Sequence, residues 1–139
     1  MEGITMTPSV KRMVYEQLDY MGISPAIKGY GYIADLVCRI LENPDSLHSL
    51  VKLYEEVGVS QNSIGSRVER AVRHAIEAFF TNKMDPNNPM WVWFSYVSPS
   101  KGKPTNGEFI ATVANQVRRD LEDRASDSEV PGQTEIGGM

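Results

Sequence analysis

The sequence has a single cysteine, Cys38, among its 139 residues. One thiol cannot close a disulfide within the chain, and it cannot supply the cysteine cluster of a structural zinc site. On an apolar helix stripe, Cys38 is expected to pack as a small buried hydrophobe. So little cysteine favours a reducing, cytoplasmic setting.

Long apolar runs are also missing. No stretch reaches the length of about 18 apolar residues that a membrane span needs, so we expect no membrane partner. The first residues, MEGITMTPSV, lack the basic flank and apolar centre of a secretory signal. The hydrophobic fraction of 41% is nevertheless enough to build the core of one compact domain.

The motifs of catalysis are absent too. The two histidines, His48 and His74, stand apart from any metal-ligand spacing, and no serine or cysteine nucleophile motif is present. The glycines at 29 and 31 do not have the spacing of a phosphate-binding loop, and are expected to mark a close helix contact. We therefore predict a protein that is not an enzyme, with no cofactor and no metal site.

The net charge of −4 is unevenly distributed. From Asp120 onward there are six acidic residues and one basic residue, whereas the preceding part carries 13 bases and 12 acids. We predict a folded domain over residues 1–122 and an acidic, disordered tail over residues 123–139. The near-neutral folded part can still bind DNA through a local basic face.

Apolar periodicity and capping signals predict an all-α fold. Thr7 and Pro8 begin a first helix that Gly22 ends. Ser24 and Pro25 are expected to begin a second helix that runs to about Leu41.

The remaining helices follow from similar signals. Asp45 or Ser46 is expected to cap a third helix, with Val51 among its apolar residues. Residues 90–94, MWVWF, are read as a short helix rather than a strand. Thr105 and Glu108 form a capping box for a last helix that ends near Glu122.

The chain is organised around residues 63–80, SIGSRVERAVRHAIEAFF. At helical spacing one face is apolar, consisting of Val68, Ala71, Val72, Ala75, Ile76 and Phe79. The other face is polar, consisting of Ser66, Arg70, Arg73 and Glu77, with Glu69 and His74 on its flanks and Arg67 near the boundary. Ser63 is expected to be the N-cap.

A short helix precedes this segment, and Asn62 and Ser63 are turn residues. A short helix, a tight turn and a polar-faced second helix form the helix-turn-helix arrangement. Arginines and a carboxylate on the second helix can bond base edges and phosphates. The residues alone leave open the alternative of an ordinary solvated surface helix in a helical bundle.

Four stretches resemble one family when taken together. They are SRVERAVRHAIE (residues 66–77), GISPAIKGYGYI (22–33), Leu53-Tyr54, and GKPTNGEFIATVANQVR (102–118). Over roughly residues 10–120 the chain resembles the C-terminal effector domain of the sporulation initiation response regulator, the stage-zero sporulation protein A family of endospore-forming bacteria.

The resemblance implies a domain of about six helices with a helix-turn-helix that binds double-stranded DNA. It implies recognition of short GC-containing boxes, often by head-to-tail copies on tandem sites, and activation or repression of transcription. The implied base-reading residues are Arg67, Glu69 and Arg70. The implied phosphate-binding residues are Ser66, Arg73 and His74, with Lys101 and Lys103 nearby.

Three departures from the family pattern bear on regulation. The family's receiver domain is not part of this sequence, which is expected to be either an excised effector domain or a naturally short relative. Residues 55–65, EEVGVSQNSIG, are less basic than the family's version. Residues 81–96, which match the region that contacts RNA polymerase sigma factor, also differ. The missing receiver, the acidic tail and the altered residues 81–96 motivate a second hypothesis, a receiver-less protein-interaction module, or antagonist, that acts on a full-length relative.

Overall fold

The computed structural model describes residues 2–129, and every regular element in that range is helical. Five α-helices are joined by two short 3-10 helices: α1 (Pro8–Met21), α2 (Lys28–Glu42), η1 (Pro44–Ser49), α3 (Leu50–Ser60), α4 (Gly65–Asn82), η2 (Pro89–Phe94) and α5 (Asn106–Glu129). The predicted all-α class with about six helices is confirmed.

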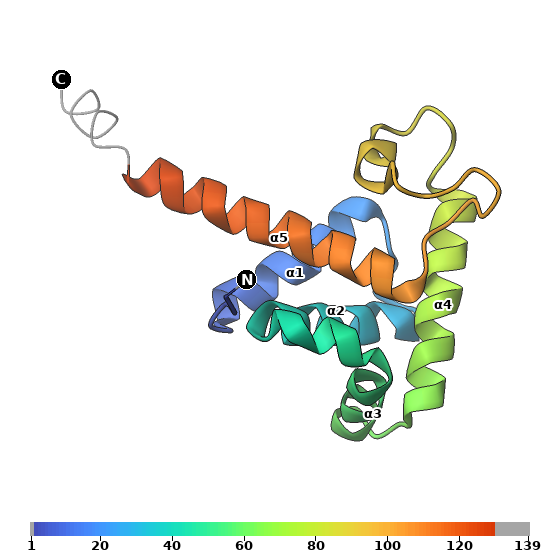
Figure 1. The fold of residues 1–139 in the computed structure, drawn as a ribbon, viewed down its shortest axis with the longest axis horizontal. Coiled ribbons are helices and arrows are strands. Elements are labelled where there is room, and N and C mark those ends of the chain that lie inside the picture. Colours follow the sequence, from blue (N-terminus) through green and yellow to red (C-terminus); the bar gives the residue numbers. More distant parts are fainter. Residues whose placement is uncertain (1, 130–139) are drawn as a thin grey trace.

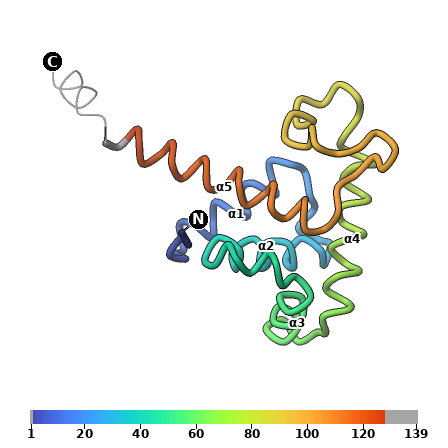
Figure 2. The backbone as a smooth tube through the Cα atoms, in the orientation of Figure 1, coloured from blue at the N-terminus to red at the C-terminus, as the bar shows by residue number. Residues whose placement is uncertain are grey.

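Helix α2 lies at the centre and contacts all four other α-helices. Figure 1 shows α4 standing along one side of the molecule, where the first turns of α2 and α5 both meet it. The tube in Figure 2 shows the connection between α4 and α5 folding over one end of α4, with η2 inside it. Two helix N-termini are therefore directed at α4.

Several helix limits agree with the sequence signals. The Thr7 hydroxyl oxygen accepts the Val10 N–H at 3.2 Å, and Gly22 ends α1 with a φ of 85°. At α5 the capping box is formed in both directions. The Thr105 N–H donates to the Glu108 carboxylate at 2.9 Å, and the Glu108 N–H donates to the Thr105 hydroxyl at 3.2 Å.

The predicted start of the second helix is wrong. Ser24 and Pro25 lie in a turn, in which the Ser24 hydroxyl accepts the Ala26 N–H at 3.2 Å, and α2 begins only at Lys28. A serine that bonds its own neighbours in this way competes with helix capping.

The expected third helix divides in two. Asp45 and Ser46 lie within the 3-10 helix η1, and α3 begins at Leu50. The Ser46 hydroxyl donates to the Asn43 carbonyl at 2.6 Å and so does not cap a helix. Val51, which was expected on the apolar side, is 71% exposed.

The last helix is longer than predicted, because α5 continues through residues 123–129 instead of ending near Glu122. Residues 122–127 are exposed, so no core contact marks where this helix should end. Of the tail predicted to be disordered, residues 123–139, the part from 123 to 129 is helical, and residues 130–139 lie outside the described residues.

An aromatic cluster fixes the C-terminal half of α4. Phe79 and Phe80 of α4, Phe94 of η2 and Phe109 of α5 contact one another, with ring centroids 5.1–6.3 Å apart. Residues 90–94 are helical as predicted, in the 3-10 form, and Phe94 is almost fully buried. Aromatic pairs at these separations stabilise the packing of α4 against its neighbours.

The crossing of α2 and α4 depends on Gly29. A Cβ at this position would lie 2.7 Å from both the Ala71 carbonyl oxygen and the Ala75 Cβ. Neither atom belongs to a flexible side-chain end, so the two helices would have to move apart. The predicted close helix contact at this glycine is confirmed.

We expect Gly29→Ala to lower the free energy of unfolding by about 1–3 kcal/mol, because an extra methyl group overpacks the crossing. Gly31→Ala, in the same helix, is the matched control, because its Cβ would meet only the Gln61 Oε1 at 3.7 Å. That substitution should be neutral or slightly stabilising. Urea denaturation measures both, and equal effects of the two substitutions would contradict the account.

Candidate nucleic-acid interface

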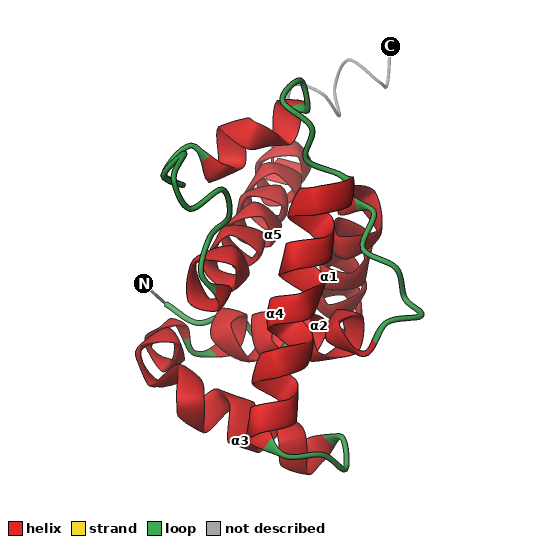
Figure 3. Cartoon of the chain, turned by 90° about the vertical axis from the view of Figure 1, so that its right-hand side faces the viewer, coloured by secondary structure: helices red, strands yellow, loops and turns green. Residues whose placement is uncertain are grey.

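Helices α3 and α4 meet through a tight turn at residues 61–64. The Ser63 N–H donates to the Gly58 carbonyl at 2.7 Å, and Asn62 has a left-handed φ of 56°. A Cβ on Gly58 would lie 2.8 Å from the Ile64 carbonyl carbon, so glycine allows the backbone to close here. Figure 3 shows α4 at the front of the molecule with α3 at one end of it. This is the helix-turn-helix order expected from the sequence.

The predicted N-cap of α4 is wrong. Ile64 precedes the first helical residue, Gly65, and makes no side-chain cap, while α4 extends to Asn82 rather than ending at Phe80. Ser63 lies one residue too early because its backbone is bonded back to Gly58. The correction leaves the polar face of α4 unchanged.

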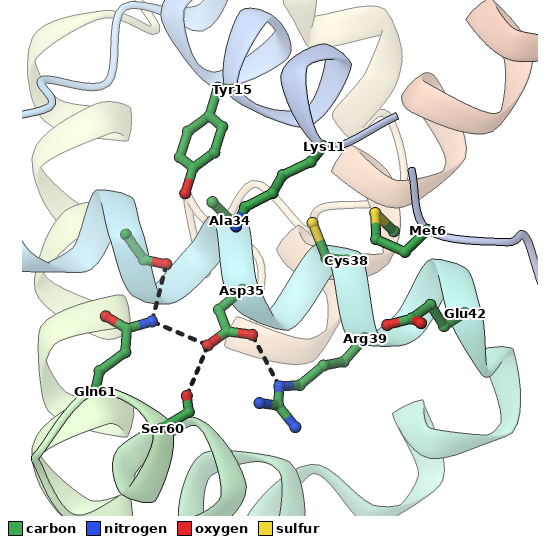
Figure 4. Close-up of a pocket in the computed structure, with 11 residues that line it drawn as sticks. Met6, Lys11, Tyr15, Ala34, Asp35, Cys38, Arg39, Glu42, Ser60 and Gln61 are labelled. Atoms are coloured by element: carbon green, nitrogen blue, oxygen red, sulfur yellow. Dashed lines mark hydrogen bonds and ion pairs between the residues drawn. The ribbon is translucent and has the colours of Figure 1, made fainter. Parts of the chain in front are cut away.

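Asp35 of α2 ties the turn to the core helix. Its carboxylate accepts the Ser60 hydroxyl at 3.1 Å and the Gln61 Nε2 at 3.0 Å, and it pairs with Arg39 at 2.8 Å (Figure 4). Arg39 also lies 3.6 Å from Glu56 of α3. These groups are partly exposed, so each bond contributes modestly, but together they fix where α3 ends relative to α2.

The amphipathic character of α4 is as predicted. Val68, Val72, Ala75, Ile76 and Phe79 are buried. Ser66, Arg67, Arg70, Arg73 and His74 are exposed, and Glu69 is partly exposed. Arg67, which helical spacing places near the boundary, is exposed.

One flank of α4 faces the start of α2 and the turn. Arg67, Arg70 and His74 line a shallow hollow of about 280 Å³ together with Lys28, Gln61, Asn62 and Ser63. Lys28 is a cation that sequence reasoning did not single out. It lies in the matched stretch GISPAIKGYGYI, but nothing local showed that it would stand beside α4.

The other flank of α4 faces the loop before α5. Glu69, Arg73 and Ile76 line a hollow of about 450 Å³ with Lys101, Lys103, Pro104, Thr105 and Asn106. The structure therefore brings both predicted lysines to α4. Lys103 pairs with Glu77 at 3.3 Å, whereas Lys101 makes no ion pair with any residue of the described range.

Glu69 and Arg73 are joined along the helix. Arg73 donates from Nε to the Glu69 Oε2 at 3.1 Å and from Nη2 to Oε1 at 3.4 Å. The Glu69 carboxylate raises the pKa of Arg73, mainly through these hydrogen bonds, so the guanidinium stays charged. The predicted base-reading and phosphate-binding residues are thus divided between two flanks, with Glu69 and Arg73 on one and Arg67, Arg70 and His74 on the other.

Asn106 is a second residue that sequence reasoning did not single out. Its Nδ2 lies 3.2 Å from the Tyr54 hydroxyl and 3.4 Å from the Glu69 Oε2. Its only sequence signal is its place in KPTN, a stretch that indicates a helix cap and a family resemblance but no contact with α4. Burial raises the pKa of Tyr54, so that hydroxyl stays protonated.

Within residues 2–129, no three His, Cys, Asp or Glu side chains gather as a metal ion would require. None of the helices in that range has the length and apolar character to cross a membrane. Cys38 is 8% exposed, as predicted for a buried hydrophobe, and burial raises its pKa to about 11.

The chain matches a known protein family. The family described as "Sporulation initiation factor Spo0A C terminal" matches residues 14–117, which is most of the chain and includes the whole of α4 and the Asn106 contact. The chain belongs to this family. It is therefore a helical, DNA-binding effector domain of the kind found in a sporulation regulator, of helix-turn-helix type, and its family acts in the regulation of transcription.

Proposed function

We propose that the chain binds specific DNA sequences by placing the exposed face of α4 in the major groove. The observation that carries this proposal is that α4 packs through its apolar stripe while its opposite face, rich in arginine, is left uncovered. In helix-turn-helix proteins the second helix enters the groove and its N-terminal residues contact base edges. Arg67 and Arg70 occupy that half of α4.

Arg67 and Arg70 are the proposed guanine readers. Both are exposed, and neither guanidinium pairs with a carboxylate of residues 2–129. Their donors are free for the O6 and N7 acceptors of guanine, which arginine can bond in a bidentate manner. Glu69 is the proposed cytosine reader, since a carboxylate accepts from the exocyclic amine N4.

The proposed phosphate contacts lie on the two flanks of α4. His74 and Lys28 serve one strand, Arg73, Lys101 and Lys103 serve the other, and Ser66 contacts a phosphate from the first turn of α4. A groove has a phosphate backbone on each side, so cations on both flanks fix the orientation of the helix between them. The first turns of α2 and α5 add partial positive charge at the same places.

We also propose two partners beyond a single duplex. Copies of the chain bind tandem boxes head to tail, and the segment of residues 81–96 contacts RNA polymerase sigma factor. In that segment Val92 is 72% exposed and Tyr96 is 47% exposed, while Phe94 anchors the segment in the core. Such an anchored, partly apolar surface suits a protein contact.

Sequence specificity is tested by Arg70→Ala on a box selected from a random duplex pool at fixed salt. We expect a loss of about 1–3 kcal/mol in binding free energy and relaxed preference at one guanine, because a bidentate base contact is removed. Arg119→Ala removes the same charge from an exposed site on α5 and should change affinity little.

Two results would count against the proposal. If selection yields no preferred sequence, α4 does not read bases. If the chain instead forms a stable complex with a full-length relative in the absence of DNA, the protein-interaction hypothesis is favoured.

The lysine loop gives a second prediction. Lys101→Ala should reduce the slope of log affinity against log salt concentration by about one, as expected for one lost phosphate contact. Lys103→Ala should reduce it less, because Lys103 is already paired with Glu77. Titrations at four salt concentrations measure both slopes, and a larger effect at Lys103 would show that the ion pair does not persist on DNA.

A further inference from the structure

Asn106 is the first residue of α5 and lies where three helices meet. Its side-chain Nδ2 is 3.2 Å from the Tyr54 hydroxyl of α3, 3.3 Å from the Glu69 carbonyl oxygen and 3.4 Å from the Glu69 Oε2 of α4. A single amide group, with two hydrogens, therefore serves both helices of the helix-turn-helix.

These contacts restrain Glu69 from outside its own helix. Arg73 lies one turn along α4, and it holds the Glu69 carboxylate only from within that helix. Asn106 holds the same Oε2 from α5 and also bonds the Glu69 backbone. Oε1 receives only the 3.4 Å contact from Arg73 among the described residues, so it keeps acceptor capacity.

We infer that Asn106 is a positioning residue for base recognition, which holds the Glu69 carboxylate in the orientation that accepts from a cytosine amine. This inference rests on the proposed function, and it adds a specificity determinant that does not itself touch DNA. A side chain held in place before binding loses less conformational freedom when the base contact forms.

The carboxamide of Asn106 is not needed to begin α5. Thr105 and Glu108 already cap that helix in both directions. A role limited to folding would therefore be met by other side chains at this position. What the amide uniquely supplies is a donor to a carboxylate and a phenol at the same time.

Asn106→Asp is the discriminating variant. It has the same shape, an acid in the first turn of a helix is favourable, and the Tyr54 hydroxyl can donate to the new carboxylate. It places a like charge against Glu69, however, and so turns the Glu69 carboxylate away. We expect the thermal midpoint to stay near that of the unchanged chain, whereas discrimination at the cytosine position falls by about fivefold or more.

The readout is the ratio of dissociation constants for the selected box and for boxes changed at one base pair, at fixed salt. Discrimination at the guanine positions should change by less than about twofold, because Arg67 and Arg70 are on the other flank. Tyr54→Phe is the matched control, since it removes one acceptor of the same amide and leaves Glu69 bound. It should preserve discrimination at every position.

The possible results separate the inference about Asn106 from the proposed function. If Glu69→Ala abolishes cytosine discrimination but Asn106→Asp does not, the inference fails and the proposed function stands. If the unchanged chain prefers no sequence, the proposed function fails. Equal losses at all positions in Asn106→Asp and Tyr54→Phe would show a purely structural role.

Asn106→Ser is the second variant if Asn106→Asp melts several degrees lower, because it removes the donor without adding charge. We expect Asn106→Ser to give the same selective loss of cytosine discrimination. Unchanged discrimination in that variant would overturn the inference.

Discussion

The burial of the apolar stripe of α4 against α2 and α3 is the constraint on which the rest of the structure depends. Val68 and Val72 are fully buried in it, and Gly29 lets the α2 backbone reach Ala71 and Ala75. Because one face of this amphipathic helix is buried in the core, its other face points toward solvent. The turn at Gly58 and the aromatic cluster at the far end of α4 then prevent the helix from rotating or sliding.

The functional arrangement follows from that constraint. The first turns of α2 and α5 reach opposite flanks of α4. Lys28 of α2 lies on one flank, and Asn106 of α5 lies on the other with Lys101 and Lys103 of the preceding loop. In the function that we propose, one helix presents base-reading side chains while its neighbours supply cations and orient Glu69. Membership of the sporulation regulator family agrees with this use of the fold.

Sequence reasoning succeeded where the signal was local and periodic. The stripe of α4, the start of α1 and the capping box of α5 each depend on residues within a few positions of one another. It failed at Ser24, Ser46 and Ser63, because a serine that bonds a nearby turn looks the same in sequence as one that caps a helix. The residues on the polar face of α4 could be identified from helical spacing and the family resemblance, whereas their roles in DNA binding stay predictions. The contacts of Asp35 and Asn106 join residues 25 to 52 positions apart, which no periodicity reveals.

The entry of α4 into the major groove is tested most directly by methylating guanine N7, an atom that lies on the floor of that groove. A selected duplex carrying one methylated guanine at a time is titrated with the chain at fixed salt. If α4 enters the major groove, we expect strong interference at one or two guanines, and loss of that interference at one of them in Arg70→Ala. Full binding to every methylated duplex, or interference that Arg70→Ala and Arg67→Ala leave unchanged, would contradict it.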